Sequence, residues 1–355
     1  MTFEAYFGRT AVRLRRDLGR FLASKRPAYE ALGPWGRDVL RRLESFTRKG
    51  KLVRGGLVSL GYEMAGGRGP SAAAVRAGTA IELVQSGLLI HDDIMDRDER
   101  RRGAPSMHVQ YARLAKDPGG PGAALFGANM AVCAGEIAIF LGFEAMAGLA
   151  GPAGRAAAAQ RLFAAEFGLV GLGQMRDIEA GGSGRRPSER AVLETYRFKT
   201  ARYSYALPLA MGWVLGGGRR GTLPALDRLG EGLGLIFQIK DDELGLFGSP
   251  RDTGKPVGSD IRQGKKTLYA LRLLARASGP DRDRLERTLG RPDAPEADIL
   301  YVRGLAERLG VREEVNRVMA SLGRRAGAAV AALPVAARHR EILQSLLRQG
   351  LSRRR

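Results

Sequence analysis

Two aspartate pairs, Asp92-Asp93 and Asp241-Asp242, each close an apolar segment of helical character. The segments before them read LVQSGLLIH and GLGLIFQI, so both pairs would lie at the ends of buried helices. Buried carboxylates are costly in free energy, and like charges repel strongly in a low dielectric. The pattern therefore predicts two acidic clusters that face each other across a cavity with hard divalent cations between them.

The rest of the chain favours helix over strand. Long stretches consist of Ala, Leu, Arg, Glu and Gly, and no convincing strand run and no Asn-Gly or Asp-Gly hairpin is found. Ser71 and Ser188 stand where helix N-caps are expected, and a helix break is expected near Pro208. Helical segments are expected within 1–66 (broken at 33–36) and at 72–99, 124–149, 153–178 and 224–246.

This continuous helical pattern predicts one domain over residues 1–355. We expect an all-α fold, a single large helical bundle around a central apolar cavity, with the two Asp-rich motifs at its mouth. The motifs fall within about residues 45–270, and a basic tail occupies 350–355.

Composition narrows the class of protein. The single Cys133 fits a reducing compartment, and the first helix is amphipathic rather than a signal peptide, so a cytoplasmic protein is expected. The longest apolar stretch contains Glu136 and Glu144, which argues against a membrane span. The net charge of +21 would suit nucleic acid or an anionic membrane surface. Arginines are spread along the whole chain without a nucleic-acid-binding motif, so only peripheral membrane contact stays open.

Candidate ligands surround the acids. Asp92 and Asp96 are four residues apart, about 40° around a helix, so they share a face that Asp93 flanks. A solvated acidic face is the alternative, but the apolar run before them disfavours it. Basic residues follow or accompany both clusters, and they are Lys51, Arg54, Arg101, Arg102, Lys199, Lys255 and Lys265. Acids that bind magnesium and bases that bind phosphate oxygens together indicate diphosphate chemistry.

Five ordered motifs resemble those of the head-to-tail (trans) isoprenyl diphosphate synthases, the polyprenyl synthetase family. They are GKxxR at 50–54, HDDIMD with RRG at 91–103, GQMRD at 173–177, KTARYS at 199–204, and QIKDD…GK…D…GKKT at 238–267. One DDxxD motif would be weak evidence, whereas all five in order are highly specific. The resemblance is strong over about 45–270.

The resemblance implies a role for each matching position. Magnesium, three ions per active site, would be bound by Asp92, Asp96 and Asp241, with support from Asp93, Asp242 and Asp177. The allylic diphosphate would be bound by Arg101, Lys199, Lys255 and Lys265, and isopentenyl diphosphate by Lys51, Arg54, Gln85 and Arg102. Thr200 and Gln238 would stabilise the allylic cation, and with Lys199, Arg101 and Lys255 they are the expected catalytic residues.

The implied reaction is ionisation, condensation and elimination in a cavity without water. The chain departs from the family pattern at Gly245, where the second motif normally has its last Asp, and at Gln85, where many members have His. The first departure removes one acid from the second site, but Asp241 and Asp242 remain, so activity is still expected. The family also implies a homodimer.

Product length is expected to depend on the residues one turn before Asp92. Gly87 is small where an aromatic residue would stop chain growth, with Leu88 beside it and Val84 below. This favours C20 geranylgeranyl diphosphate over C15 farnesyl diphosphate, while products of C25 or longer stay open. A class I terpene cyclase would not need Lys51, Arg54 and Arg102, and a regulatory subunit would usually have lost the acids. A head-to-head squalene or phytoene synthase would carry a different acidic pattern.

Overall fold

The computed structural model describes all residues except 70, 183–185, 249–257 and 354–355. The fold is all-α, as predicted. The chain forms two compact units, Met1–Ala164 with Pro208–Arg220 and Ala165–Leu207 with Gly221–Arg355, and each is described separately. The single domain predicted from the sequence stays a prediction.

The first unit begins with two long helices. Their bounds follow local signals: Thr2 caps α1 (Phe3–Glu30) by accepting from the Ala5 N–H, and Gly33 (φ 104°) precedes Pro34 at the start of α2 (Pro34–Arg48). The break predicted at 33–36 is therefore confirmed. The remaining helices of this unit are α3 (Val53–Met64), α4 (Ala72–Met95), α5 (Met107–Ala112), α6 (Ala123–Ala147), the first part of α7 (Ala153–Gly182) and most of α9 (Leu207–Leu215).

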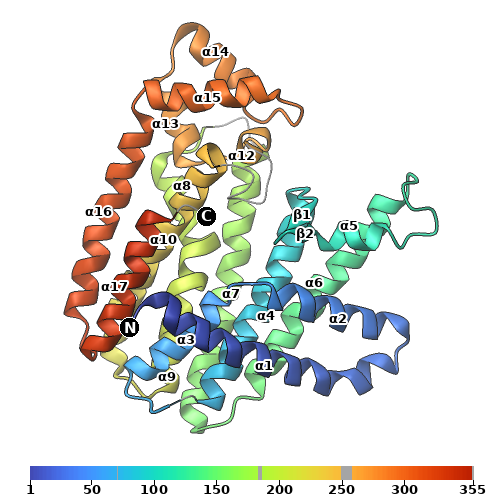
Figure 1. Cartoon of the computed structure of the whole chain (residues 1–355), viewed down its shortest axis with the longest axis vertical. Helices are drawn as coiled ribbons and strands as arrows, with labels where there is room; N and C mark the ends of the chain where they lie inside the picture. The colour runs from blue at the N-terminus through green and yellow to red at the C-terminus, as the bar shows by residue number, and fades with distance from the viewer. Residues whose placement is uncertain (70, 183–185, 249–257, 354–355) are drawn as a thin grey trace. The chain divides into compact units, whose positions relative to one another are not determined.

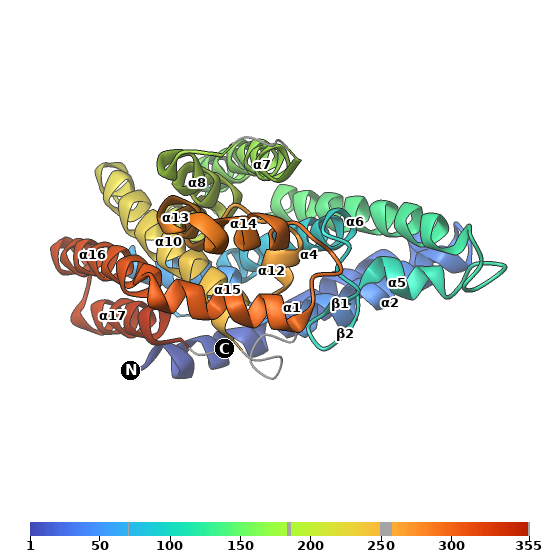
Figure 2. The ribbon, with the colours of Figure 1, turned by 90° about the horizontal axis from the view of Figure 1, so that it is seen from above.

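Helices α4 and α6 pack along each other (Figure 2). The approach is close because glycines lie at the contact: a Cβ at Gly87 would lie 2.5 Å from the Gly135 carbonyl oxygen, and one at Gly142 would lie 2.5 Å from Val84 Cγ2. Ser71 caps α4 by accepting from the Ala74 N–H at 3.3 Å, as predicted.

Helices α4 and α6 are also long and apolar enough to cross a membrane, by length and composition alone. The apolar window of α4 is 72% buried within the protein, as in the core helix of a soluble protein, so this is weak evidence for a span. The window of α6 is only 33% buried, and its exposed apolar side is considered below.

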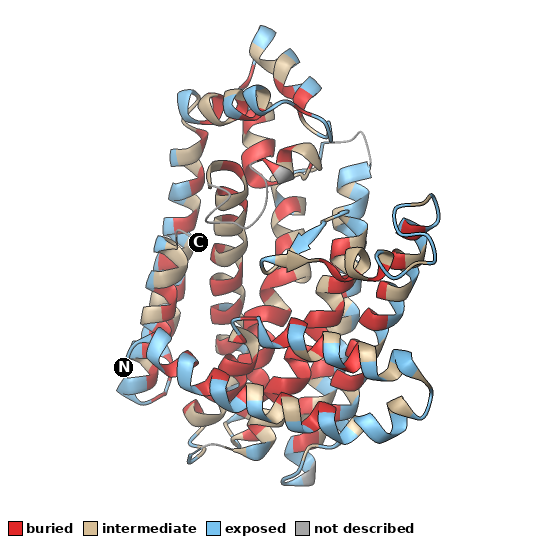
Figure 3. Ribbon diagram, turned by 45° about the vertical axis from the view of Figure 1, so that its right-hand side comes forward, coloured by how far each residue is buried: buried red, intermediate tan, exposed pale blue. Residues whose placement is uncertain are grey.

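The second unit is built around α10 (Leu223–Phe247), which packs against η1 (Arg197–Ala206), α16 (Val311–Ala332) and α17 (Ala337–Ser352). Figure 1 shows α16 and α17 side by side, and Figure 3 shows how buried residues line the inward sides of the helices. The other elements are α8 (Glu189–Tyr196), α12 (Ser259–Arg262), α13 (Leu268–Arg276), α14 (Gly279–Thr288) and α15 (Glu296–Arg308), with the 3₁₀ turn η2 (Arg220–Thr222) at the boundary of the units. Ser188 caps α8, as predicted.

Two local expectations are wrong. A short hairpin, β1 (Arg100–Arg101) with β2 (Ala104–Pro105), follows the first acidic cluster where a loop without strands was expected. Arg102 and Gly103 turn it with φ 53° and 74°, and an Arg at a left-handed position is not a usual hairpin signal. The second is the break near Pro208: helical backbone continues because η1 is a π-helix, in which the Leu207 N–H donates to the Arg202 carbonyl five residues earlier.

Candidate active site

The first acidic cluster lies at the end of α4. The Asp96 N–H donates to the Asp92 carbonyl at 2.8 Å, which extends the helical turn so that both acids stay on one side, as the spacing predicted. Both are half-buried, whereas Asp93 is fully buried. The two members of the first pair therefore differ in burial: the Asp92 side chain is 22% exposed although its Oδ1 atom is buried, whereas Asp93 is fully buried.

Asp93 is held by Arg101 from the β1 strand. Arg101 Nε donates to Asp93 Oδ1 at 2.6 Å, and its terminal nitrogen lies 3.2 Å from Asp98 and 4.0 Å from Asp92. Burial raises the pKa of Asp93 to about 6 although Arg101 opposes the shift. Its other oxygen, Oδ2, is buried and has no hydrogen-bond partner among the described residues. The hairpin thus brings Arg101 into the acidic cluster.

The predicted isopentenyl side contains one residue that the sequence did not reveal. Glu82 is buried on α4, and its carboxylate accepts from the Gly55 N–H at 2.9 Å. Burial raises its pKa, while Arg54 and Arg102 oppose the shift, so these two predicted ligands lie close to one carboxylate. An acid inside an apolar helix, ten residues before Asp92, is the signal that the sequence offers. Its burial beside two guanidinium groups indicates a positioning role.

Arg102 and Gln85 complete this part of the first unit. Arg102 donates to the Phe46 carbonyl at 2.6 Å and lies over the Phe46 ring. A Cβ at Gly50 would lie 3.0 Å from the Arg102 guanidinium, so the Gly of the GKxxR motif lies beside this arginine. Gln85 is buried, and its Oε1 has no hydrogen-bond partner in the described part of the chain. Lys51 is exposed.

The expected open space at Gly87 is absent. The Gly135 carbonyl and the Ile139 side chain occupy the position where a side chain at Gly87 would begin, so this glycine serves helix packing. Val84 is likewise buried against α6. Leu88 is only half-buried and lies four residues before Asp92, on the same helix face. Of the three predicted chain-length residues, Leu88 is the one whose side chain is partly accessible.

The second acidic cluster rests on a hydrogen-bonded chain inside the second unit. Asp242 is buried and accepts from the Tyr196 hydroxyl and, at 3.0 Å, from Gln238 Nε2. The Thr200 hydroxyl donates to Gln238 Oε1 at 2.9 Å, and the Leu268 N–H donates to the Tyr196 oxygen at 3.0 Å. Burial raises the pKa of Asp242 well above its usual value, and Asp260 adds to the shift. Tyr196 is therefore a supporting residue whose role was not predicted from the sequence.

Asp241 is the accessible member of the second pair. Its side chain is 38% exposed, and its Oδ1 lies 2.5 Å from the guanidinium of Arg353, which also lies over the Phe237 ring. Arg353 was expected to be a solvated tail residue. Long-range contacts of this kind leave no local signal in the sequence.

The departure at Gly245 has a structural explanation. A Cβ at this position would lie 2.2 Å from Oδ2 of Asp260, the Asp of the GK…D segment. Gly245 stands where the second motif normally has its last Asp. The carboxylate of Asp260 therefore lies where the side chain of that Asp would begin. The sequence predicted the loss of one acid here, but it did not indicate that another approaches.

The cationic part of this unit is held by α7 and η1. Lys199 lies 2.5 Å from Asp177, so Asp177 positions the lysine, and Gly173 allows α7 to approach the Lys199 backbone. Arg202 donates to both oxygens of Glu166, at 2.7 and 2.8 Å, and also to Glu231, which anchors the π-helix. Lys265 is half-buried, and Lys255 lies outside the described residues.

The chain is similar to known proteins over most of its length. The model of the polyprenyl synthetase family matches residues 38–305. A short chain isoprenyl diphosphate synthase from Methanothermobacter thermautotrophicus is 37% identical over 273 residues, which cover 77% of each chain. A geranylgeranyl diphosphate synthase from Saccharolobus solfataricus is 30% identical, and the match covers 72% of this chain and 71% of that one. The crystal structure of a geranylgeranyl pyrophosphate synthase from Corynebacterium glutamicum, complexed with isoprenyl diphosphate and magnesium, gives a TM-score of 0.91 at 28% identity, covering 97% of this chain and 99% of that one.

Proposed function

The chain belongs to the polyprenyl synthetase family and is an isoprenyl diphosphate synthase, and from this premise we propose that it joins isopentenyl diphosphate to allylic diphosphates in a magnesium-dependent, head-to-tail reaction. The product would be an all-E prenyl diphosphate, C20 geranylgeranyl diphosphate. The observation that carries the proposal is common to the two aspartate pairs. Each pair has one partly exposed carboxylate beside one that is buried and hydrogen-bonded.

The donor set fits magnesium. The accessible acids Asp92, Asp96 and Asp241 would bind it, and carboxylate oxygens are the ligands this ion prefers. Within the described residues, no group of three or more acidic, histidine or cysteine side chains is arranged to hold a metal ion. Magnesium usually keeps several water ligands and shares substrate phosphates, and three ions per active site are proposed. Bound magnesium would neutralise the charge of the diphosphate leaving group.

The supporting acids fit their roles as well. Asp93 and Asp242 are buried and hydrogen-bonded, so they would fix the ends of α4 and α10 rather than exchange ligands freely. Asp177 would act through Lys199, which it contacts.

The cationic residues would divide between the two substrates. Arg101, Lys199, Lys255 and Lys265 are proposed for the allylic diphosphate. Lys51, Arg54, Arg102 and Gln85 are proposed for isopentenyl diphosphate, and the buried Glu82 would orient the two arginines. Among the described residues, the amide oxygen of Gln85 has no hydrogen-bond partner, and the NH₂ group of the same amide could donate to a phosphate.

The chemistry would follow from charge placement. The allylic C–O bond breaks, the isopentenyl double bond attacks the resulting cation, and a proton is lost to the departed diphosphate. Thr200 donates its hydroxyl proton to Gln238, so the lone pairs of Thr200 stay available to a cation. No side-chain nucleophile is required.

Product length would depend on Leu88. Replacing it with Phe would shorten the product, because the half-buried position on the Asp92 face admits a larger ring. The relatives named for short-chain and geranylgeranyl products support C20, and C15 or C25 and longer are the alternative outcomes.

The exposed side of α6 supports the proposed homodimer. Leu125, Val132 and Phe140 are 66%, 43% and 65% exposed, and they recur at seven- and eight-residue spacing along one face. A second copy of the chain would bury this apolar stripe. Nucleic acid is not proposed as a partner, and the enzyme is proposed to act in the cytoplasm.

The test is to incubate the purified chain with magnesium, labelled isopentenyl diphosphate and, separately, the C5, C10 and C15 allylic diphosphates. Products are dephosphorylated and sized by chromatography. A C20 alcohol supports the full proposal, whereas a C15 or longer alcohol keeps the reaction and corrects the product. Conversion of an allylic diphosphate without incorporation of isopentenyl diphosphate would indicate a terpene cyclase, and no turnover by folded protein would indicate a regulatory subunit.

A further inference from the structure

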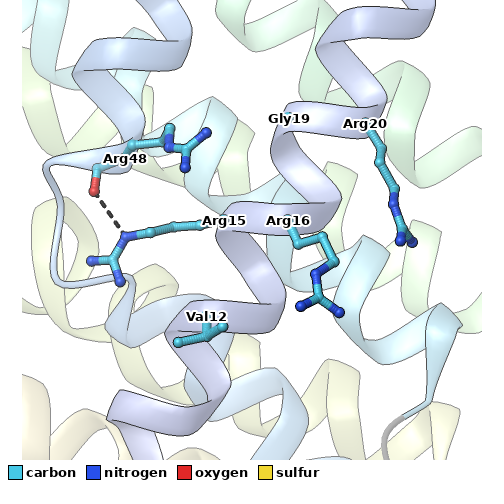
Figure 4. A pocket seen from close by; sticks show the side chains of 6 residues that line it. All are labelled: Val12, Arg15, Arg16, Gly19, Arg20 and Arg48. Atoms are coloured by element: carbon cyan, nitrogen blue, oxygen red, sulfur yellow. Dashed lines mark hydrogen bonds between the residues drawn. The ribbon is translucent and has the colours of Figure 1, made fainter.

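A basic hollow lies on the first unit, away from both acidic clusters in sequence. It has a volume of about 410 Å³ and lies between one side of α1 and the end of α2 (Figure 4). It is lined by Val12, Arg15, Arg16, Gly19, Arg20 and Arg48. Four of the six lining residues are arginines, and all but Arg48 precede residue 38, where the family match begins.

Two of the arginines are held in place by the fold. Arg15 donates through Nε to the Arg48 carbonyl at 3.1 Å and through a terminal nitrogen to the Gly50 carbonyl at 3.3 Å. These bonds cap the end of α2, as Figure 4 shows for Arg48. Arg48 itself bonds Glu44 at 3.0 Å. The guanidinium groups on this side of the hollow are therefore ordered before any ligand arrives.

The other two arginines lack a counter-charge. Arg16 and Arg20 are exposed, and neither forms an ion pair or a hydrogen bond within the described residues. Asp17, between them in sequence, does not serve them because its carboxylate is bonded to Arg76 and Thr79. Glu44 is shared by Arg48 and, at 4.0 Å, Arg26. The hollow thus carries an excess of positive charge.

We propose that this hollow binds phosphate groups, either on a small molecule that carries several negative charges or as neighbouring headgroups on a membrane surface. Guanidinium groups bind phosphate oxygens through paired, charge-assisted hydrogen bonds, and Arg16 and Arg20 have all their donors available. The phosphate could come from an anionic lipid headgroup, which the exposed Val12 at the rim would suit, or from soluble diphosphate, the by-product of the proposed reaction. The site does not depend on the proposed function.

Gly19 provides a matched pair of test variants. A Cβ there would meet Glu44 and Arg48 only at 3.4 and 3.8 Å, which is ordinary contact. Gly19→Ala should keep the hollow's charge, and Gly19→Glu should place an acid inside it. Both replace a helix-interior glycine with a better helix former, so neither should unfold α1. Arg16→Gln with Arg20→Gln removes the unpaired charges directly, and Arg13→Gln with Arg9→Gln removes equal charge from α1 outside the hollow.

The experiment measures binding of the full-length chain, without magnesium, to two probes: vesicles of phosphatidylcholine with one third phosphatidylglycerol, and inorganic diphosphate. We expect Gly19→Glu and the Arg16/Arg20 pair to weaken binding by about thirtyfold, while Gly19→Ala and the Arg9/Arg13 pair change it by less than about threefold. Loss on vesicles alone assigns the lipid source, and loss of one equivalent of bound diphosphate assigns the soluble source.

The proposal is overturned if neither probe binds, or if both arginine pairs weaken binding equally, which would indicate only a diffuse basic surface. Prenyl transfer is measured on the same variants. None of these residues is placed in the active site. Absence of prenyl transfer in the wild-type chain would therefore count against the proposed function, whereas the phosphate site would still be tested by the binding measurements.

Discussion

The two aspartate pairs have the same sequence and different supports. In the first, the buried Asp93 is held by a cation, Arg101. In the second, the buried Asp242 is held by neutral donors, Tyr196 and Gln238. A cation stabilises the ionised carboxylate, whereas a neutral network in a dry interior leaves a high pKa. The difference teaches that a repeated aspartate pair can hold its buried member by two unrelated means.

The largest effect is expected where the pairs are alike. Asp92→Ala and Asp241→Ala should each lower kcat/KM by about a thousandfold, because each removes a carboxylate proposed to bind magnesium. Steady-state kinetics with thermal unfolding as the control measures this. Full activity in either variant would show that the two pairs are not equivalent in function.

The next largest effect tests the neutral network. Tyr196→Phe should lower the free energy of unfolding by about 2 kcal/mol, because Asp242 and the Leu268 N–H lose a buried partner together. Tyr62→Phe, which removes a hydroxyl from a half-buried position of the first unit, is the control. Equal small losses in both variants would mean that the network contributes little to stability.

A pH experiment sharpens the contrast at Asp93. Its pKa is about 6 in the folded chain and lower when unfolded, so the folded state binds more protons between these values. Stability contributed by this group is therefore present at low pH and lost as pH rises through about 6. Relative to Asp93→Asn, the wild-type chain should gain about 2 kcal/mol between pH 7 and pH 4. A constant difference across this range, measured by denaturant unfolding, would contradict the assigned environment.

The smallest effect concerns Arg353, which contacts Asp241. Arg353→Gln should lower the magnesium concentration for half-maximal binding by about two- to fivefold, since a partly exposed ion pair competes with the metal only weakly. A calorimetric magnesium titration measures this without turnover, with Arg348→Gln, in the helix α17 that precedes Arg353, as the control. A weaker affinity in Arg353→Gln would show that the arginine supports metal binding instead.

These contrasts mark what the sequence could predict. Helix bounds followed from local rules, as Ser71 and Ser188 show, and the four-residue spacing predicted that Asp92 and Asp96 lie on one side of the same helical turn. The residues that contact the second aspartate pair could not be predicted, because Tyr196 and Arg353 are separated from their partners by 46 and 112 residues of sequence. The π-helix and the Arg102–Gly103 turn have no standard residue signal either.

Gly87 shows a different kind of error. The small size of Gly87 predicts open space, but in the structure it allows close contact with the α6 backbone. From sequence alone, a glycine in a helix can indicate either open space or close packing against a neighbouring helix. The position of the neighbouring helix decides between the two.

That contact has a consequence for how the enzyme could be altered by mutation. Helix α6 meets α4 at Gly87 on one side and carries Leu125, Val132 and Phe140 on its exposed side. A side chain introduced at Gly87 would meet the Gly135 carbonyl oxygen at 2.5 Å, so α6 would have to shift, and its exposed residues would shift with it. If a second copy of the chain binds these exposed residues, as proposed above, a substitution aimed at product length should also change self-association.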